Sequence, residues 1–326
     1  MRVAIYKDTL TNRRGADAAT IALAEGLRTR GYDTCLFEKT DFANRIGESW
    51  DVILSTGTNE LLDICAYTGR RDFPWPVVQL FHTNPKSQFK WKHFRRNSAI
   101  RAALKRVDVI QVLSEGFVPQ VAGYGAKVAV IGNWSKYEGF TAKDAKTTGK
   151  VVIYPAAFAK GKNQKLLIKA FAKVSGEYPD WRLRLLGRAE GRYADECRQL
   201  VAKLNCQDRI DFAGYSDDMA KEYSACDFVA FPSFDEGFPL TLVDAAAFSK
   251  PVLMVNDWIG TCAENGGILT PPSVKAYAEG LGRLMADKEL CCTLGENARR
   301  FCDGEYSREK ILDKWESLLE NIYDKR

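Results

Sequence analysis

The sequence has 326 residues, of which 46% are hydrophobic and 27% charged, and its formal net charge is +5. This length exceeds one ordinary hydrophobic core and suits two α/β domains, while the small net charge argues against a nucleic-acid partner. No apolar run reaches the length of a membrane span, and the N-terminal residues lack the pattern of a signal peptide.

Apolar runs with the pattern of strands alternate with helical patterns over the first part of the chain. The first run, 2–6, is followed by a helical pattern over about 16–30 that ends at Gly31. Strands are also predicted at 34–38, 51–55, 76–81, 107–114 and 128–134. Because such alternation is typical of parallel βαβ units, we expect a doubly wound, Rossmann-like domain over residues 1–137.

The polar, aperiodic stretch 138–149 predicts a linker. Beyond it the alternation starts again, with an amphipathic helix at 163–174 and strands at 151–155, 182–187, 209–214, 228–233 and 251–256. We therefore expect a second Rossmann-like domain over 150–305 and a final helix over 306–326 with one apolar face. The predicted fold class is α/β, with two doubly wound domains facing a central cleft, where ligands bind at the carboxyl ends of the strands.

Two loops that follow strands carry candidate anion-binding groups. Neither a G-x-G-x-x-G nor a P-loop pattern follows any strand. Gly15 opens the first helix, where the backbone can approach a ligand and the helix N-terminus attracts anions. Lys160 and Lys162 lie between a strand end and a helix start, where they can neutralise a phosphate. The alternatives are a glycine that only serves a turn and lysines that are only solvated.

The stretch FDEGFPLTLVDAAAFSKPVL, residues 234–253, carries two acids around a helix start. Glu236 precedes the helix and Asp244 lies one to two turns inside it. Pro239 suits the first helical turn, so Gly237, Phe238 and Leu240 would present free amides that suit phosphate or sugar hydroxyls. Carboxylates at the two positions can accept hydrogen bonds from two parts of one extended ligand. The alternative is a pair of solvated acids.

His82 directly follows the strand predicted at 76–81, at the edge where a ligand would bind. A histidine in a loop is as often structural as catalytic, and both interpretations stay open.

The segment 86–106 contains eight Lys or Arg residues, no acid and three interleaved aromatic residues. It could form a solvated helix face, bind nucleic acid or lie on an anionic membrane surface. We favour a membrane surface or an anionic acceptor over nucleic acid, because this local charge contrasts with a nearly balanced chain. The candidate residues are Lys90, Trp91, Lys92, Arg95 and Arg96.

Together these motifs resemble glycosyltransferase family 4, whose members are retaining, nucleotide-sugar-dependent enzymes of the GT-B fold. The family segment PS-x-x-EGFPL-x-x-x-EA-x-A-x-x-x-PV corresponds here to PSFDEGFPLTLVDAAAFSKPV. Further similarity lies in KNQ at 162–164, in RLRLLG, in RIDFAGYSDDMAKEYSACDFV, in the final aromatic helix and, in the N-terminal half, in RRGADAATIALAEGL and VIGNW.

The resemblance implies a role for each matching position. Glu236 would contact the donor sugar, and Asp244 would hold the nucleotide ribose. Lys162 would neutralise the diphosphate, with Gly15 near the donor phosphate and His82 near the reacting sugar. The backbone of Gly237, Phe238, Pro239 and Leu240 would hold the sugar and the pyrophosphate. The last helix would return to pack on the first domain.

Three positions depart from the family pattern. Asp244 stands where the family has glutamate, and Ala157 stands where it has an arginine, so Lys160 or Arg188 would have to compensate. The segment 255–272 is also shorter than the usual donor-side loop.

The resemblance implies a hexosyltransferase acting with retention, with the donor phosphate itself taking the acceptor's proton. The chain lacks the paired acids of metal-dependent transferases, so we expect no metal and no cofactor. The expected partners are a nucleotide-sugar donor, with UDP or GDP, and a glycan or lipid-linked acceptor of cell-surface polysaccharide or glycolipid synthesis. A sugar-nucleotide epimerase of the same fold, a non-catalytic two-lobed sugar-binding protein and a degenerate transferase remain alternatives.

The nine cysteines are scattered and show no C-x-x-C spacing. This pattern favours reduced thiols over a disulfide framework or a zinc site. We therefore expect a cytoplasmic protein, with a peripheral position at the inner face of the membrane if segment 86–106 binds lipid.

Overall fold

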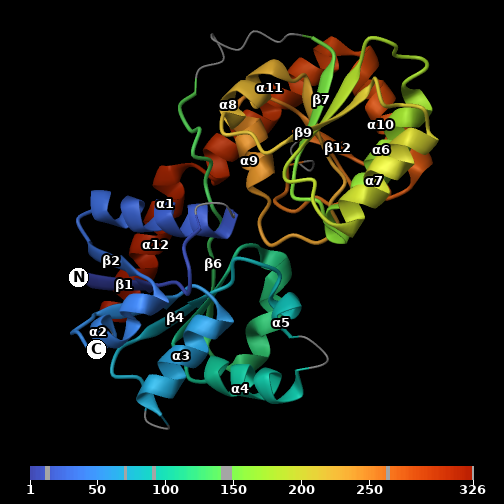
Figure 1. Cartoon of the computed structure of the whole chain (residues 1–326). Helices are drawn as coiled ribbons and strands as arrows, with labels where there is room; N and C mark the ends of the chain where they lie inside the picture. Colours follow the sequence, from blue (N-terminus) through green and yellow to red (C-terminus); the bar gives the residue numbers. More distant parts are fainter. Residues whose placement is uncertain (12–14, 70–71, 90–92, 141–148, 262–264, 325–326) are drawn as a thin grey trace. The chain divides into compact units, whose positions relative to one another are not determined.

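The computed structural model describes residues 1–11, 15–69, 72–89, 93–140, 149–261 and 265–324. The chain divides into two compact units (Figure 1). Unit 1 comprises Met1–Trp134 and Arg308–Arg326, and unit 2 comprises Ser135–Ser307. The boundary at Ser135 precedes the expected linker over 138–149, and residues 141–148 of that linker lie outside the described residues.

Unit 1 contains one sheet of six parallel strands in the order β2–β1–β3–β4–β5–β6. The strands are β1 (Arg2–Tyr6), β2 (Asp33–Phe37), β3 (Val52–Ser55), β4 (Val77–Leu80), β5 (Val109–Val112) and β6 (Lys127–Val130). All four residues of β3, β4 and β5 are buried. A parallel sheet covered on both faces produces such continuous apolar runs, which is why the sequence pattern locates these strands.

Helices cover both faces of this sheet, with α3 and α4 on one face and α1 and α12 on the other (Figure 1). Their bounds are α1 (Gly15–Thr29), α2 (Phe42–Arg45), α3 (Thr58–Thr68), α4 (Phe94–Leu104), α5 (Val118–Val121) and α12 (Arg308–Tyr323). The last helix, α12, packs on α1 and buries Leu312 and Trp315. Gly26 of α1 makes this close packing possible, because a Cβ atom there would lie 2.7 Å from Leu312 Cδ2.

An arginine directly after α1 fixes α12 from the solvent side. The Arg30 guanidinium contacts Glu309 at 2.7 Å, Asp313 at 2.8 Å and Glu316 at 2.5 Å. One planar cation therefore bridges three carboxylates on successive turns of α12.

Unit 2 contains a second parallel sheet, in the order β12–β11–β10–β7–β8–β9. Read from β9, this is the strand order of doubly wound nucleotide-binding folds, with the reversal between β7 and β10. The strands are β7 (Val151–Pro155), β8 (Arg182–Leu186), β9 (Ile210–Gly214), β10 (Phe228–Phe231), β11 (Val252–Met254) and β12 (Gly267–Leu269). The predicted α/β class with two doubly wound domains is confirmed.

The helices of unit 2 form two groups, α6, α7 and α10 on one side of the sheet and α8, α9 and α11 on the other (Figure 1). Their bounds are α6 (Gln164–Val174), α7 (Arg192–Lys203), α8 (Met219–Ala225), α9 (Leu240–Ala247), α10 (Val274–Ala286) and α11 (Lys288–Glu305). A short 3-10 turn, Lys160–Lys162, precedes α6.

Two strand predictions need correction. The strand expected at 128–134 is Lys127–Val130 and ends before the Gly-Asn-Trp segment. Strand β12 was not predicted, because it follows Gly266, begins with Gly267 and has only three residues, too few to show a period.

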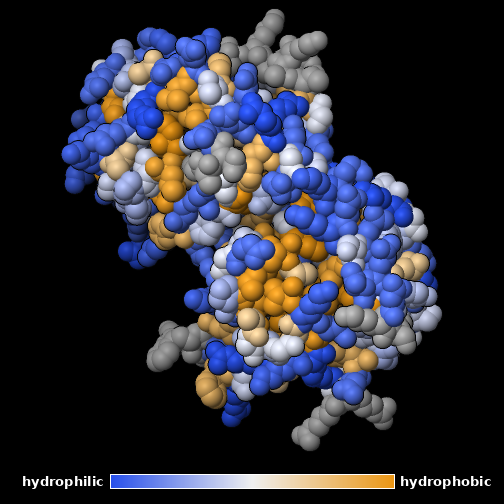
Figure 2. Space-filling model, turned by 180° about the vertical axis from the view of Figure 1, so that it is seen from behind, coloured by the Kyte–Doolittle hydropathy of each residue, from blue (hydrophilic) through white to orange (hydrophobic). Residues whose placement is uncertain are grey.

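In the part of the chain that the structure describes, no helix is both long and apolar enough to cross a membrane. Figure 2 shows hydrophilic residues across much of the drawn face, with hydrophobic areas on each unit.

Candidate active site

The first group of predicted site residues lies in unit 2, where the strand order reverses between β7 and β10. Lys162 follows β7, and Glu236 follows β10. Because β7 and β10 are paired in parallel, their carboxyl ends lie side by side, and such reversal points are where open α/β sheets bind ligands. The topology thus brings together two residues that are far apart in the sequence.

Lys162 and Glu236 form an ion pair, with Lys162 Nζ 2.5 Å from Glu236 Oε1 and 2.6 Å from Oε2. The Glu236 side chain is 9% exposed and the Lys162 side chain 29% exposed. Charge-assisted bonds of this kind are stronger than neutral ones. The lysine ammonium group therefore stands at the surface end of a nearly buried carboxylate.

Backbone contacts fix the two loops that carry this ion pair. The Gly161 carbonyl accepts hydrogen bonds from Phe234 N at 3.1 Å and from Ser233 Oγ at 3.2 Å. The Tyr154 hydroxyl donates to the Lys162 carbonyl at 2.7 Å. The loops after β7 and β10 therefore form one connected wall.

Helix α9 begins at Leu240, four residues after Glu236, and its start carries backbone amides available to a ligand. The Phe238 ring turns inward and packs edge to face on Tyr306, with 5.3 Å between ring centroids. Within the described residues, the backbone amides of Gly237, Phe238 and Leu240 donate no hydrogen bond to another protein group. Unpaired amides at a helix N-terminus favour an anionic ligand.

Asp244 lies one turn further along α9, where Ser135 orients its carboxylate. Ser135 Oγ lies 2.6 Å from Asp244 Oδ1 and accepts a hydrogen bond from Tyr137 N at 3.1 Å. Because an ionised carboxylate can only accept, the Ser135 hydroxyl donates its hydrogen to Asp244. Desolvation raises the pKa of Asp244 to about 6, against the opposing effects of Ser135 and the Lys136 ammonium group.

The two candidates for replacing the missing arginine lie near the same edge of the sheet. Lys160 and Arg188 are both exposed. Arg188 follows Gly187, whose added Cβ would lie 2.2 Å from the Ala156 carbonyl oxygen. The chain after β8 therefore runs against the chain that carries Ala157, the position where the family pattern has arginine.

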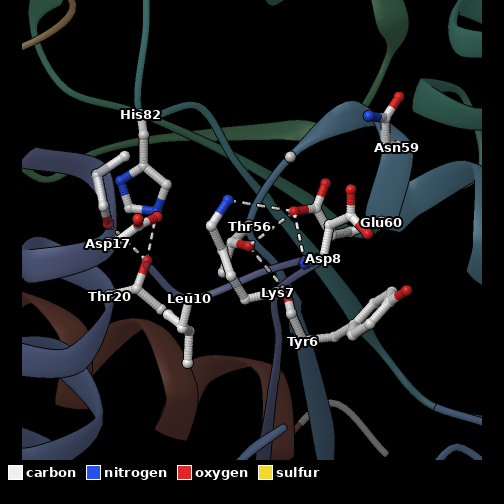
Figure 3. Close-up of polar contacts among 12 residues, drawn as sticks. Tyr6, Lys7, Asp8, Leu10, Asp17, Thr20, Thr56, Asn59, Glu60 and His82 are labelled. Carbon is white, nitrogen blue, oxygen red and sulfur yellow. Dashed lines mark hydrogen bonds and ion pairs between the residues drawn. The ribbon is translucent and has the colours of Figure 1, made fainter. Parts of the chain in front are cut away.

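The second group of predicted site residues, Gly15 and His82, lies in unit 1. Gly15 is exposed and is the first residue of α1. His82 follows β4 and lines a pocket of about 550 Å³ at the carboxyl ends of β1, β3 and β4 (Figure 3). This volume is in the range of small-molecule sites.

The buried hydroxyl of Thr20 fixes the protonation of His82. Thr20 Oγ1 donates to the Ala16 carbonyl at 2.8 Å and lies 3.2 Å from His82 Nε2. With the hydroxyl hydrogen directed to Ala16, this geometry favours the tautomer that carries its hydrogen on Nε2. Burial and the Lys7 charge lower the pKa of His82 to about 4, which keeps the ring neutral near pH 7.

Two acids that the sequence analysis did not single out also line this pocket. Asp17 is 2% exposed, and its Oδ2 accepts from Thr11 N at 3.2 Å and from Thr11 Oγ1 at 2.7 Å. Glu60 is 3% exposed, and its Oε1 accepts from Asp8 N at 3.0 Å and from Lys7 Nζ at 3.3 Å. Figure 3 shows Lys7, Asp8 and Thr56 converging on Glu60.

The basic segment is only partly described, since Lys90, Trp91 and Lys92 lie outside the described residues. Arg95 is exposed. Arg96 instead bonds within unit 1, donating to Asn59 Oδ1 at 2.7 Å and to Thr58 Oγ1 at 3.2 Å. Arg96 thus links α4 to the start of α3. From the sequence it was only a candidate for contact with a membrane or an acceptor.

Across the described ranges, no group of three or more His, Cys, Asp or Glu side chains is placed to hold a metal ion.

Comparison with known families identifies the chain. The model of the family described as glycosyl transferases group 1 matches residues 136–301, about half of the chain, and includes Lys162, Glu236 and Asp244. The chain belongs to the group 1 glycosyl transferases.

Individual relatives of this group 1 glycosyl transferase are distant. An exopolysaccharide phosphotransferase of Streptomyces coelicolor is 30% identical over 68% of this chain, which spans only 24% of that protein. The lipopolysaccharide core biosynthesis glycosyltransferase LpsE of Rhizobium meliloti is 26% identical over 72% of this chain and 71% of its own length.

The solved structure of Anabaena HepE in complex with UDP and glucose superposes with a TM-score of 0.78. It is 19% identical and covers 98% of this chain and 99% of its own. At this identity the likeness establishes the fold of the group 1 glycosyl transferase.

Sequence reasoning named the group of Lys162, Glu236 and Asp244 but missed Ser135 and the pocket acids. Ser135 lies beside the linker with no motif around it, 109 residues from Asp244. Asp17 and Glu60 occupy first helical turns, where acids are common for helix stability alone. Only the fold shows that they are buried and face a pocket.

Proposed function

We propose that this protein is a retaining glycosyltransferase that moves a sugar from a UDP- or GDP-sugar to a hydroxyl group of a glycan or a lipid-linked acceptor. One observation carries the proposal: the Lys162–Glu236 ion pair adjoins the free amides at the start of α9. A cation and unpaired amides suit a diphosphate, and a nearly buried carboxylate suits sugar hydroxyls. Membership of the group 1 glycosyl transferases supports this assignment.

In the proposed complex each part of the donor has its own contact. Glu236 accepts hydrogen bonds from the donor sugar, and Asp244 accepts them from the ribose. Lys162 and the amides of Gly237, Phe238 and Leu240 stabilise the diphosphate, assisted by Lys160 or Arg188. Gly15 and His82 of unit 1 face the donor phosphate and the reacting sugar.

The reaction breaks the bond between the sugar C1 and the diphosphate oxygen and forms a bond from C1 to the acceptor oxygen on the same face. The acceptor proton passes to the departing phosphate. Negative charge grows on the diphosphate in the transition state, so fixed donors there contribute most. We propose that Lys162 and the α9 amides supply this stabilisation without a metal ion or other cofactor.

The acceptor of the proposed reaction binds unit 1 and belongs to cell-surface polysaccharide or glycolipid synthesis. The names of the Streptomyces and Rhizobium relatives support this class. An acceptor carried by a lipid would bring the protein to the cytoplasmic face of a membrane. There Arg95 and Phe94, which is 82% exposed at the start of α4, would meet anionic headgroups.

A thermal-shift screen of UDP, GDP, ADP and CMP with their sugars, followed by product analysis without an acceptor, tests the proposal. We expect a diphosphate nucleotide to raise the melting temperature, and its sugar to turn over only slowly into free sugar. Conversion of the nucleotide sugar into its epimer without an acceptor would establish the epimerase alternative. Stabilisation by free sugars but by no nucleotide would establish a sugar-binding protein.

Co-sedimentation with liposomes tests the membrane position. We expect binding to vesicles with anionic phosphatidylglycerol to exceed binding to neutral phosphatidylcholine vesicles, and to weaken as salt rises. Arg95→Gln and Phe94→Ala should each reduce it, whereas Arg192→Gln, at an exposed position on unit 2, should not. Equal binding to both kinds of vesicle would contradict the electrostatic proposal.

A further inference from the structure

The pocket of unit 1 carries acceptor atoms that no protein group uses. Asp17 and Glu60 are 2% and 3% exposed, and each spends one carboxylate oxygen on internal contacts. In the described part of the chain, Asp17 Oδ1 and Glu60 Oε2 receive no hydrogen bond. Both residues line the pocket and neither oxygen is sealed from it, so each can accept a hydrogen bond from a ligand that donates.

The same wall is unsuited to an anion. Helix N-termini and nearby loop amides are ordinary anion sites, but here the chain's own carboxylates take such amides. Asp17 occupies Thr11 N, and Glu60 occupies Asp8 N. Among the residues that line the pocket, Lys7 contacts Glu60 at 3.3 Å and is outnumbered by the acids Asp8, Asp17 and Glu60.

Local backbone geometry maintains the arrangement at Glu60. Gly57 precedes α3, and a Cβ atom there would lie 2.5 Å from Glu60 Oε2. Glycine therefore allows the Glu60 carboxylate to pack against the backbone just after the carboxyl end of β3. Among the other pocket groups, Thr56, Thr58, Thr83 and the neutral His82 are polar and uncharged at pH 7, and Asp8 adds a further carboxylate.

From these contacts we infer that the unit 1 pocket binds a neutral sugar ring, whose hydroxyls donate to Asp17 Oδ1 and Glu60 Oε2, and discriminates against uronic acids and sugar phosphates. A hydroxyl is both donor and acceptor, so it satisfies the free carboxylate oxygens and can still accept from threonine hydroxyls. A carboxylate or phosphate at the same wall would place like charges in contact within a partly buried site. The inference rests on the proposed function only in identifying this sugar as the acceptor.

Ligand-observed saturation-transfer NMR on the full chain tests the inference without requiring turnover. The probes are methyl glucoside and methyl galactoside, each paired with its uronic acid, methyl glucuronide or methyl galacturonide. We expect the neutral member of each pair to bind about tenfold more tightly, and Asp17→Asn to weaken that binding about tenfold, the effect of losing a hydrogen bond to a charged group. In the same variant the uronides should bind more tightly than they bind the wild type.

Matched variants locate the binding site. Asp8→Asn removes a carboxylate that accepts no hydrogen bond from described residues and should narrow the preference for neutral sugars with little effect on folding. If Asp17→Asn lowers the melting temperature, Asp8→Asn provides the test in its place. Asp72→Asn, at an exposed position in unit 1, should leave the preference unchanged.

The inference is overturned if uronides bind as well as neutral glycosides, if no glycoside binds at millimolar concentration, or if neither pocket variant changes the preference. Glycoside binding with the expected preference, in a protein that uses no nucleotide sugar, would sustain the inference and refute the proposed function. Transfer from a nucleotide sugar by a protein that shows no preference for neutral glycosides would sustain the proposed function and refute the inference.

Discussion

The two candidate sites occupy corresponding places in their sheets but use backbone amides in opposite ways. In unit 2 the amides at the start of α9 donate to no other described residue, and the carboxylate of Glu236 is neutralised by Lys162. In unit 1 the carboxylates of Asp17 and Glu60 occupy nearby amides. The first arrangement suits an anion and the second suits hydroxyl groups, so one fold class, used twice, provides two kinds of site.

Removal of Glu236 should have the largest effect on the unit 2 site. We expect Glu236→Ala to reduce transfer about 100-fold or more, the range for losing one preorganised electrostatic contact, with folding retained. Steady-state transfer and thermal melting measure the two effects. Asp235→Ala, at the adjacent exposed acid, is the matched control, and wild-type turnover in Glu236→Ala would refute the assignment.

Lys162→Met should weaken the diphosphate site specifically. Loss of a hydrogen bond to a charged group predicts about 10- to 100-fold weaker binding of the nucleoside diphosphate, measured by calorimetry, and a smaller loss for the monophosphate. Lys169→Met, at an exposed position on α6, should change affinity by about twofold or less, as expected for a screened surface charge. Equal effects of the two variants would show that Lys162 holds no special position.

The pH dependence of nucleotide binding should report on Asp244. Its pKa is raised to about 6, so affinity for the nucleoside diphosphate should fall as the pH drops from 7 to 5 and the carboxylate takes up a proton. A raised carboxyl pKa means that the folded state binds the proton more tightly than the unfolded state. Protonation of Asp244 therefore increases the free energy of unfolding as the pH falls from 7 to 5. Lost affinity there is thus not a sign of local unfolding.

Two variants assign this pH dependence. Asp244→Asn should remove the part of it that exceeds the titration of the ligand's own phosphate, while His82→Gln should preserve it, since the pKa of His82 lies near 4. A pH dependence that disappears in His82→Gln would contradict the assignment.

Ser135→Ala should have the smallest effect and would sharpen the comparison. It removes one hydrogen bond to the ionised Asp244, so we expect about fivefold weaker nucleotide binding at pH 7. The pH midpoint should also rise, because that bond favours the charged form. Unchanged affinity and midpoint would mean that Asp244 keeps its position without Ser135.

The fold was predictable from the sequence because most strands are buried on both faces. Their continuous apolar runs are visible without any partner, whereas the three-residue β12 beside Gly266 is not. The unit 2 site was predictable because Glu236 and Asp244 share one local segment, whose spacing matches a known family.

The remaining features depend on contacts between residues far apart in sequence. Glu60 meets Asp8 across 52 residues, and Arg96 meets Asn59 across 37. Acids near helix starts and arginines in a basic run look the same in the sequence whether they are solvated or buried. Their roles follow from the packing of the sheet and its helices.

The return of α12 to unit 1 has a consequence for the order in which the protein can fold during synthesis. Unit 2 is one uninterrupted stretch, so its synthesis is complete before any residue of α12 is added. Unit 1 receives Leu312, Trp315 and the three carboxylates around Arg30 only after the whole of unit 2 has been translated. During synthesis of unit 2, the apolar surface of unit 1 that α12 will cover therefore stays uncovered. The unit that is synthesised first is thus the unit that finishes folding last.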